Sequence, residues 1–176
     1  MTWIPVLVLC LLVIVSFKRI YFFKRWTSWQ KITLYSALVY SITVVWLTFY
    51  PAGMAFFAGS YKPIKYFGNV AYNLVALKYF DGGFVENVLM TVPAGVYLRL
   101  AKPKLSLVQL IGWALLPGLA IESCQFISDM AVNLQRVVDI DDLCANTLGV
   151  LLGFICLQLL ERTSLKKLII KLSLAN

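Results

Sequence analysis

The chain has 176 residues, of which 61% are hydrophobic and 14% charged, and its formal net charge is +8. Soluble globular domains usually contain about 45–50% apolar and about 25% charged residues, so this composition excludes a soluble domain and indicates an integral membrane protein. The absence of histidine, together with cysteines that lack any paired C-x-x-C spacing, excludes a zinc site, and we expect no nucleic-acid partner.

Apolar runs, taken in chain order, predict transmembrane helices, because a span needs about 20 mostly apolar residues. The runs cover residues 3–17, 32–50, 84–100, 105–127 and 143–160. Cations follow the first run, and no small-residue cleavage motif is present, which indicates a retained helix and not a cleaved signal. We therefore expect an all-α fold, a polytopic membrane bundle of about five transmembrane helices.

Two further segments are expected to lie on the membrane surface. Residues 61–80 mix aromatic side chains with lysines around Gly68 and Asn69, which suits an interfacial or re-entrant segment. The tail at 161–176 combines leucine and isoleucine with lysine and predicts a short basic amphipathic helix on the anionic inner leaflet. The chain then divides into 1–60 with the first two helices, 61–160 with the rest of the membrane domain, and 161–176 as a cytoplasmic tail.

The distribution of charge predicts the orientation in the membrane. Most lysines and arginines lie after the first, third and fifth helices, and cytoplasmic loops retain positive charge, so the amino terminus is expected outside and the carboxyl terminus inside. The acids, apart from Glu161, fall on the opposite side. Because acids contribute little to orientation, their placement marks the outer face as chemically distinct.

Polar side chains occupy the outer halves of three predicted helices. Glu122 and Gln125 share a face of the fourth helix, and Asp142 and Asn146 share a face of the fifth. Asn87 lies near the start of the third. Polar groups inside a bilayer are costly unless they face a protein interior or a wet cavity. We expect them to converge on one outward-facing pocket; the alternative is three unrelated helix ends.

The stretch "RVVDIDDLCANTLGVLLG" places Asp139, Asp141 and Asp142 directly before an apolar helix. Aspartates favour the positive amino-terminal end of a helix, so Asp141 or Asp142 is expected to cap it. Capping explains why one aspartate is present, but it is a poor explanation for three. Arg136, the cation in the loop before this helix, is the expected partner of Glu122, and it forms an i, i+3 pair with Asp139 if that stretch is helical.

Four sequence blocks together resemble the VanZ-like family, membrane proteins named for a teicoplanin-resistance protein. The blocks lie within about 72–160, and the matching residues are Asn73, Leu74, Asn87, Pro93, Gly95, Glu122, Gln125, Arg136, Asp139, Asp142, Asn146, Gly149 and Gly153. Ala76 and Leu77 depart from the usual Pro-Phe of the first block. The resemblance implies a multi-helix membrane protein, in some members linked to lowered susceptibility to teicoplanin-type glycopeptides.

The favoured hypothesis is a cell-membrane protein of the bacterial envelope with a polar pocket on the extracytoplasmic side. The pocket would bind a lipid, a cell-wall precursor or a lipoglycopeptide antibiotic, and its predicted residues are Asn73, Asn87, Glu122, Gln125, Arg136, Asp139, Asp142 and Asn146. Close helix packing is expected at Pro93, Gly95, Gly149 and Gly153. The sequence does not indicate an oligomeric state.

The alternative is a membrane-embedded enzyme in which Glu122, Asp139 and Asp142 act as acid and base or bind Mg²⁺ or Ca²⁺. The chain has no G-x-S-x-G or H-E-x-x-H motif and no phosphate-binding glycine loop, so we expect neither a cofactor nor a resident metal. A proton relay needs acids through the whole membrane, whereas these acids stop in the outer half. An interaction partner or regulator of a larger envelope assembly stays open.

The cysteines, Cys10, Cys124, Cys144 and Cys156, lie mostly inside or beside apolar runs and are expected to be small buried residues. A disulfide between Cys124 and Cys144 is the alternative, and it requires two helix ends to be neighbours.

Overall fold

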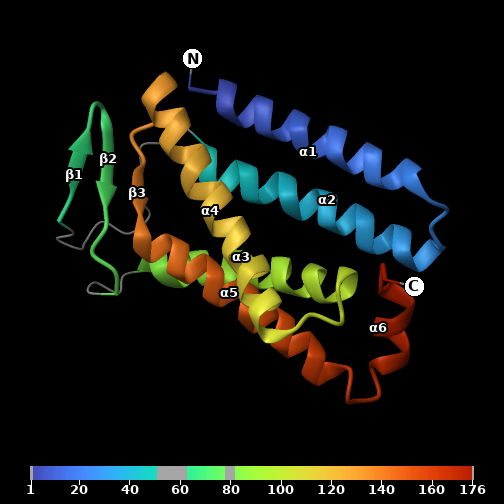
Figure 1. Ribbon diagram of the computed structural model, residues 1–176. Helices are drawn as coiled ribbons and strands as arrows, with labels where there is room; N and C mark the ends of the chain where they lie inside the picture. The colour runs from blue at the N-terminus through green and yellow to red at the C-terminus, as the bar shows by residue number, and fades with distance from the viewer. Residues whose placement is uncertain (1, 51–62, 78–81, 176) are drawn as a thin grey trace.

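The computed structural model describes residues 2–50, 63–77 and 82–175, and it is mostly helical (Figure 1). In chain order the elements are α1 (Ile4–Phe23), α2 (Ser28–Phe49), β1 (Lys65–Phe67), β2 (Val70–Asn73), α3 (Gly82–Ala101), α4 (Leu107–Val132), β3 (Val137–Asp139), α5 (Ile140–Leu160) and α6 (Lys166–Leu172). Figure 1 shows the three strands at one end of the bundle and α6, with the α1–α2 loop, at the other.

Each predicted span is a long helix, so the helical bundle is confirmed. Within the described residues α1, α2, α4 and α5 are long and apolar enough to cross a membrane. α3 has 20 residues but is not one of these. It packs mainly along α5, as Figure 1 shows. The sequence prediction of about five spans is thus supported for four of them by length and apolarity.

Helix starts are set by local chemistry that the apolar runs did not reveal. α2 begins at a capping box, in which Thr27 Oγ1 accepts from Gln30 N and Gln30 Oε1 accepts from Thr27 N. α4 begins at the same motif, formed by Ser106 and Gln109. Each box satisfies backbone donors that a helix start leaves unpaired, so the helices begin there even where the flanking residues are polar.

Glycines allow the backbones of α3 and α5 to touch where the two helices pack together. A Cβ atom on Gly95 would overlap the carbonyl of Val150, and one on Gly153 would overlap the carbonyl of Val92. Gly149 lies against the carbonyl of Val88 in the same way. Small residues are what permit such an approach between membrane helices. Pro93 lies inside α3, within this contact.

The α1–α2 hairpin is joined to the rest of the bundle by apolar packing of Val45 and Phe49 with Leu134 and by side-chain hydrogen bonds. The Tyr40 hydroxyl donates to the Met90 carbonyl of α3 at 2.9 Å, and Gln125 Nε2 of α4 donates to the Thr48 carbonyl at 3.3 Å. Arg136 Nη2 donates to the carbonyl of Tyr50, directly after α2. Most side chains of α1 are exposed, which is expected of a helix that faces lipid on several sides.

A small sheet closes one end of the bundle and was not expected from the sequence. β1 and β2 form an antiparallel hairpin around Gly68, whose φ of +61° suits glycine, and β2 pairs with β3 in parallel. In this register Asn73 is opposite Asp139. Residues 63–77, predicted as part of an interfacial or re-entrant segment, therefore form a strand hairpin followed by a turn.

The tail forms a short helix where the sequence predicts one, and it folds back onto the bundle. Ile169 is buried against Leu100 and Leu157. At the last residue of α6, the Leu172 carbonyl accepts from Thr33 Oγ1 of α2 at 2.8 Å, and beyond the helix the backbone N–H of Leu174 donates to the Leu100 carbonyl at 2.8 Å. The tail therefore contacts α2, α3 and α5 at once. Its contact with the inner leaflet, and the boundaries at 60 and 160, stay predictions.

Candidate functional site

The sheet brings Asn73 and Asp139 together at the start of α5. Asn73 Nδ2 donates to Asp139 Oδ1 at 2.9 Å, and both residues are buried. The same oxygen accepts from the backbone N–H of Asp141 at 2.9 Å. The backbone N–H of Asp139 donates to Glu122 Oε2 at 3.0 Å. Asp139 thus connects β2, α4 and α5 at one point.

Asp139, and not Asp141 or Asp142, is the cap of α5, so the predicted cap assignment was wrong. Its backbone is extended, with φ −126° and ψ 128°, as a cap residue requires, while its side chain accepts from the second residue of the helix. Pairing with β2 holds Asp139 in this extended conformation. Asp141 and Asp142 follow it in the first helical turn.

The predicted ion pair between Glu122 and Arg136 is also wrong. Among the residues that the structure describes, Glu122 accepts from the backbone of Asp139, while Arg136 donates to the carbonyl of Tyr50 at 3.1 Å. Arg136 precedes a strand, so three extended residues place it roughly 10 Å along the chain from Asp139. The helical i, i+3 pair of Arg136 with Asp139 therefore does not form.

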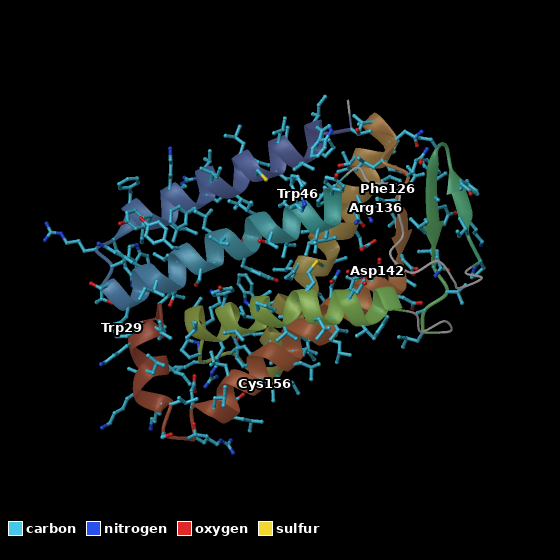
Figure 2. The ribbon with its side chains drawn as sticks, turned by 180° about the vertical axis from the view of Figure 1, so that it is seen from behind. Trp29, Trp46, Phe126, Arg136, Asp142 and Cys156 are labelled. Atoms are coloured by element: carbon cyan, nitrogen blue, oxygen red, sulfur yellow. The ribbon has the colours of Figure 1, made fainter. Side chains whose placement is uncertain are left out.

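Asp142 and Asn146 extend the group along α5 toward α4. Asp142 is in the first turn of α5. Asn146 lies one turn further along α5 and is 1% exposed. A Cβ atom on Gly118 of α4 would be 3.2 Å from Asn146 Cβ, so the two helices are close here. Figure 2 shows Asp142 on the side of the bundle toward the sheet, far from Trp29.

Several buried polar atoms in this region have no hydrogen-bond partner in the described structure. Glu122 and Gln125 are each 8% exposed, and Asn146 and Asp141 are each 1% exposed. The unpartnered atoms are Glu122 Oε1, Gln125 Oε1, Asp141 Oδ2, Asn146 Oδ1 and Asn146 Nδ2. More than about 90% of buried polar groups in proteins are paired, so this concentration marks the site. We call Asn73, Glu122, Gln125, Asp139, Asp141, Asp142 and Asn146 the polar cluster.

Two predicted pocket residues lie outside these contacts. Asn87 is half-buried on α3, where its backbone carbonyl accepts from Thr91 Oγ1 at 2.8 Å. Thr91 Oγ1 also donates to the Asn146 carbonyl, so α3 reaches the cluster through Thr91. No hydrogen bond joins the side chain of Asn87 or Arg136 to the polar cluster within the described ranges.

Asp141 and Asp129 are buried acids that the predicted pocket did not include. Asp141 Oδ1 accepts from the backbone N–H of Leu77 at 2.6 Å, a contact across 64 residues that no local pattern reveals. Asp129 Oδ1 accepts from the backbone N–H of Gln135 at 2.7 Å. It thereby holds the turn after α4, where Asn133 and Gln135 both have positive φ. Asn133 at this helix end is a sequence signal for such a turn.

Neither a metal site nor a disulfide is formed by the described residues. No group of three His, Cys, Asp or Glu side chains in residues 2–50, 63–77 and 82–175 is arranged to hold a metal ion. Whether the acids bind Mg²⁺ or Ca²⁺ stays a prediction. All four cysteines are free, so the alternative disulfide between Cys124 and Cys144 is wrong.

Comparison with known proteins places the chain in a family. A family model described as VanZ/LLP1 matches residues 4–161. The chain belongs to the VanZ/LLP1 family. The match includes α1 and α2, so the VanZ/LLP1 region is longer than the stretch from 72 to 160 indicated by the motif blocks. Searches of the curated proteins and of the solved structures found no match to this chain.

Proposed function

We propose that this VanZ/LLP1 protein is a membrane protein of the bacterial cell envelope whose polar cluster binds the headgroup of a lipid, cell-wall precursor or lipoglycopeptide from the extracytoplasmic side. By this binding it would lower susceptibility to teicoplanin. The observation that carries the proposal is the set of buried, unpartnered side-chain atoms on α4 and α5.

The unpartnered atoms favour a ligand because burial without a partner is unfavourable. Each such atom costs about 1–3 kcal/mol relative to a satisfied one. A chain that only needed to cap α5 would use Asp139, and Asn146 could then be apolar. Asn146 supplies no side-chain hydrogen bond to any described residue, yet it is fully buried. A bound headgroup would supply the missing partners.

The chemistry of these atoms favours a ligand that donates hydrogen bonds. Four of the unpartnered atoms are acceptor oxygens, and only Asn146 Nδ2 is a donor. Asp139, whose backbone N–H donates to Glu122 Oε2, brings a further carboxyl group beside Glu122. Ammonium groups and sugar hydroxyls match this environment, whereas a phosphate would meet acceptors and like charge. We therefore expect an amine-bearing or sugar-bearing headgroup.

The position of the cluster suits a ligand with an apolar anchor. The exposed residues beside it on α4, including Leu119 and Ile127, are large and apolar, as a lipid-facing surface requires. A headgroup at Glu122 can therefore keep its acyl chain in the bilayer. This geometry is compatible with a lipid, a lipid-linked wall precursor and an acylated glycopeptide, and all three carry hydroxyl or amine donors.

The test compares Asn146→Leu and Glu122→Gln with Glu86→Gln as a matched control, because Glu86 is exposed on α3. Binding of an amine-bearing lipid, phosphatidylethanolamine, and of a glycolipid is measured on the purified protein in nanodiscs. We expect the cluster variants to bind these lipids roughly tenfold more weakly, because each loses about one buried hydrogen bond to the ligand. The control should bind them as the wild-type protein does. In cells expressing equal amounts, teicoplanin susceptibility should follow binding.

Three results would contradict parts of this proposal. Wild-type binding in both cluster variants would remove the cluster as the binding site. Preferred binding of an anionic lipid there would refute the donor-type ligand. Unchanged teicoplanin susceptibility despite lost binding would separate the site from resistance. Turnover of a labelled lipid that is lost in Glu122→Gln would instead favour the enzymatic alternative, with Glu122, Asp139 and Asp142 as the reacting groups.

A further inference from the structure

The turn that follows β2 exposes four consecutive apolar residues. Leu74, Val75, Ala76 and Leu77 are all exposed, Leu74 at 68% and Leu77 at 54%. Turns that face water are built mostly from glycine, proline and short polar residues, which either suit the backbone of the turn or bind it. This turn contains none of these residue types. We call residues 74–77 the apolar turn.

Leu77 has a left-handed backbone conformation that leucine rarely adopts. Its φ is +57°, in the region that glycine and asparagine enter most readily. The exposed turn between β1 and β2, by contrast, places Gly68 at a φ of +61° and follows it with Asn69. The β1–β2 turn thus has the composition of a water-facing turn, whereas the apolar turn keeps a leucine at a strained position. This leucine is favoured by what its side chain contacts and not by its backbone.

Two buried side chains of the polar cluster bind the backbone of the apolar turn. The N–H of Val75 donates to Asn73 Oδ1 at 3.0 Å, and the N–H of Leu77 donates to Asp141 Oδ1 at 2.6 Å. Irregular backbone is costly in lipid because its polar groups lose their hydrogen bonds to water. At these two positions the protein itself supplies the acceptor. The N–H groups of Val75 and Leu77 therefore do not require water.

The apolar turn lies level with the end of a membrane-spanning helix. α5 has 21 residues, which makes it roughly 32 Å long, and the hydrocarbon core of a bilayer is about 30 Å thick. Asp141, in the first turn of α5, is then at the boundary of that core, and so is Leu77, which it binds. Figure 1 shows the turn beside the starts of α3 and α5. On α3, Val85 and Leu89 are exposed and apolar, so the surface near this end stays apolar.

We infer that the apolar turn inserts Leu74, Val75 and Leu77 into the lipid leaflet at the sheet end of the bundle. Its backbone lies at the boundary between headgroups and acyl chains, where Asn73 and Asp141 replace the lost water. In the predicted orientation this is the outer leaflet. The inference goes beyond the proposed function and does not depend on a ligand, but it gives the polar cluster a direct connection to the bilayer.

The experiment measures the depth of single nitroxide labels in a cysteine-free background, reconstituted in vesicles of phosphatidylethanolamine and phosphatidylglycerol. The test label is at Leu74→Cys. The lipid reference is Leu119→Cys on α4, and the water reference is Lys102→Cys beyond α3. Collisions with oxygen, which dissolves in lipid, are compared with collisions with a water-soluble nickel chelate. We expect the ratio of oxygen to nickel collisions at Leu74 to match that at Leu119 and to exceed that at Lys102 several-fold.

Substitution of Leu77 tests whether its apolar side chain holds the turn in lipid. Leu77→Asn suits the left-handed backbone better and should leave the fold intact, but it should lower the oxygen-to-nickel ratio of the Leu74→Cys label several-fold. Leu77→Met is the matched control, because it keeps an apolar side chain of similar size, and the ratio should stay high. Circular dichroism checks that both variants fold.

Three results would overturn the inference. A label at Leu74 as accessible to the nickel chelate as the label at Lys102 would place the turn in water. A label protected from both oxygen and nickel would show that protein, such as a second copy of this chain, covers the turn instead of lipid. Equal ratios in Leu77→Asn and Leu77→Met would show that the apolar side chain of Leu77 does not hold the turn in the leaflet.

Discussion

Asn73 and Asp139 are opposite one another in neighbouring parallel strands, and Asn73 Nδ2 donates to Asp139 Oδ1 at 2.9 Å. The bond joins residues 66 positions apart in the chain. It fixes the residue that caps α5 to the strand hairpin, so the polar cluster depends on the small sheet as well as on the helices.

The first prediction concerns this bond. Asn73→Ala should destabilise the protein by about 1–3 kcal/mol, because it leaves a buried carboxyl oxygen with one partner fewer. A double-mutant cycle with Asp139→Ala, measured by reversible unfolding in detergent micelles, should give a favourable coupling energy. Additive losses would show that the two side chains do not interact.

A second prediction follows from the cap. Asp139→Asn should keep most of the stability of α5, since asparagine caps a helix as well as aspartate does, while Asp139→Ala should lose about 0.5–2 kcal/mol. Asp142→Ala should have the smaller effect, because Asp142 is in the first turn and does not cap the helix. Unfolding followed by circular dichroism measures the three variants. A larger loss for Asp142→Ala would contradict the assignment of Asp139.

The contact between α3 and α5 gives a third prediction. Gly153→Ala should cost about 1–3 kcal/mol or prevent folding, because its Cβ would overlap the backbone of Val92. Gly112→Ala is the matched control, since nothing lies within 4 Å of a Cβ at that position of α4. Thermal unfolding in detergent should separate the two. Equal tolerance of both substitutions would mean that the helices are further apart.

Arg99 and Glu161 provide a fourth prediction. Their side chains are 12% and 26% exposed, and the pair joins the end of α3 to the end of α5. Glu161→Gln should therefore lower stability by about 1–3 kcal/mol, whereas Arg162→Gln, at an exposed neighbour, should change it by less than about 0.5 kcal/mol. The charge-reversed pair Arg99→Glu with Glu161→Arg should recover part of the loss in the same unfolding assay.

The orientation is the fifth prediction and is tested by cysteine labelling in a cysteine-free background. Ala131→Cys, exposed near the end of α4, should react with an impermeant reagent added outside intact cells. Lys102→Cys, exposed beyond α3, should react only after permeabilisation. Asp141 is an unsuitable reporter because it is 1% exposed. The reverse labelling pattern would place the polar cluster on the cytoplasmic side.

The sequence predicted the helices because each contains a long apolar run, and hydrophobicity is read one segment at a time. It did not predict the sheet, whose strands have three or four residues and whose partners, such as Asn73 and Asp139, are far apart in the chain. The grouping of Asn73, Glu122 and Asp139 was expected from the family blocks, and the structure joins them by hydrogen bonds.

The errors at the site concern the segment before α5. Arg136 was chosen as the partner of Glu122 because it is the cation in that loop, and its i, i+3 pair with Asp139 depended on that stretch being helical. The backbone there is a strand, which moves Arg136 to Tyr50 and makes Asp139 the cap. The burial of Asp141 depends on Leu77, and a contact across 64 residues has no local signature in the chain.

The attachment of the α1–α2 hairpin has a consequence for comparison with relatives. At Met90, Thr48 and Tyr50 the accepting atom is a main-chain carbonyl, which every amino acid possesses. In these three bonds the accepting residue can therefore change in evolution without loss of the acceptor. The restriction falls on the donating residues, so covariation between the donor and acceptor positions of these bonds should be weak even though the residues are in contact.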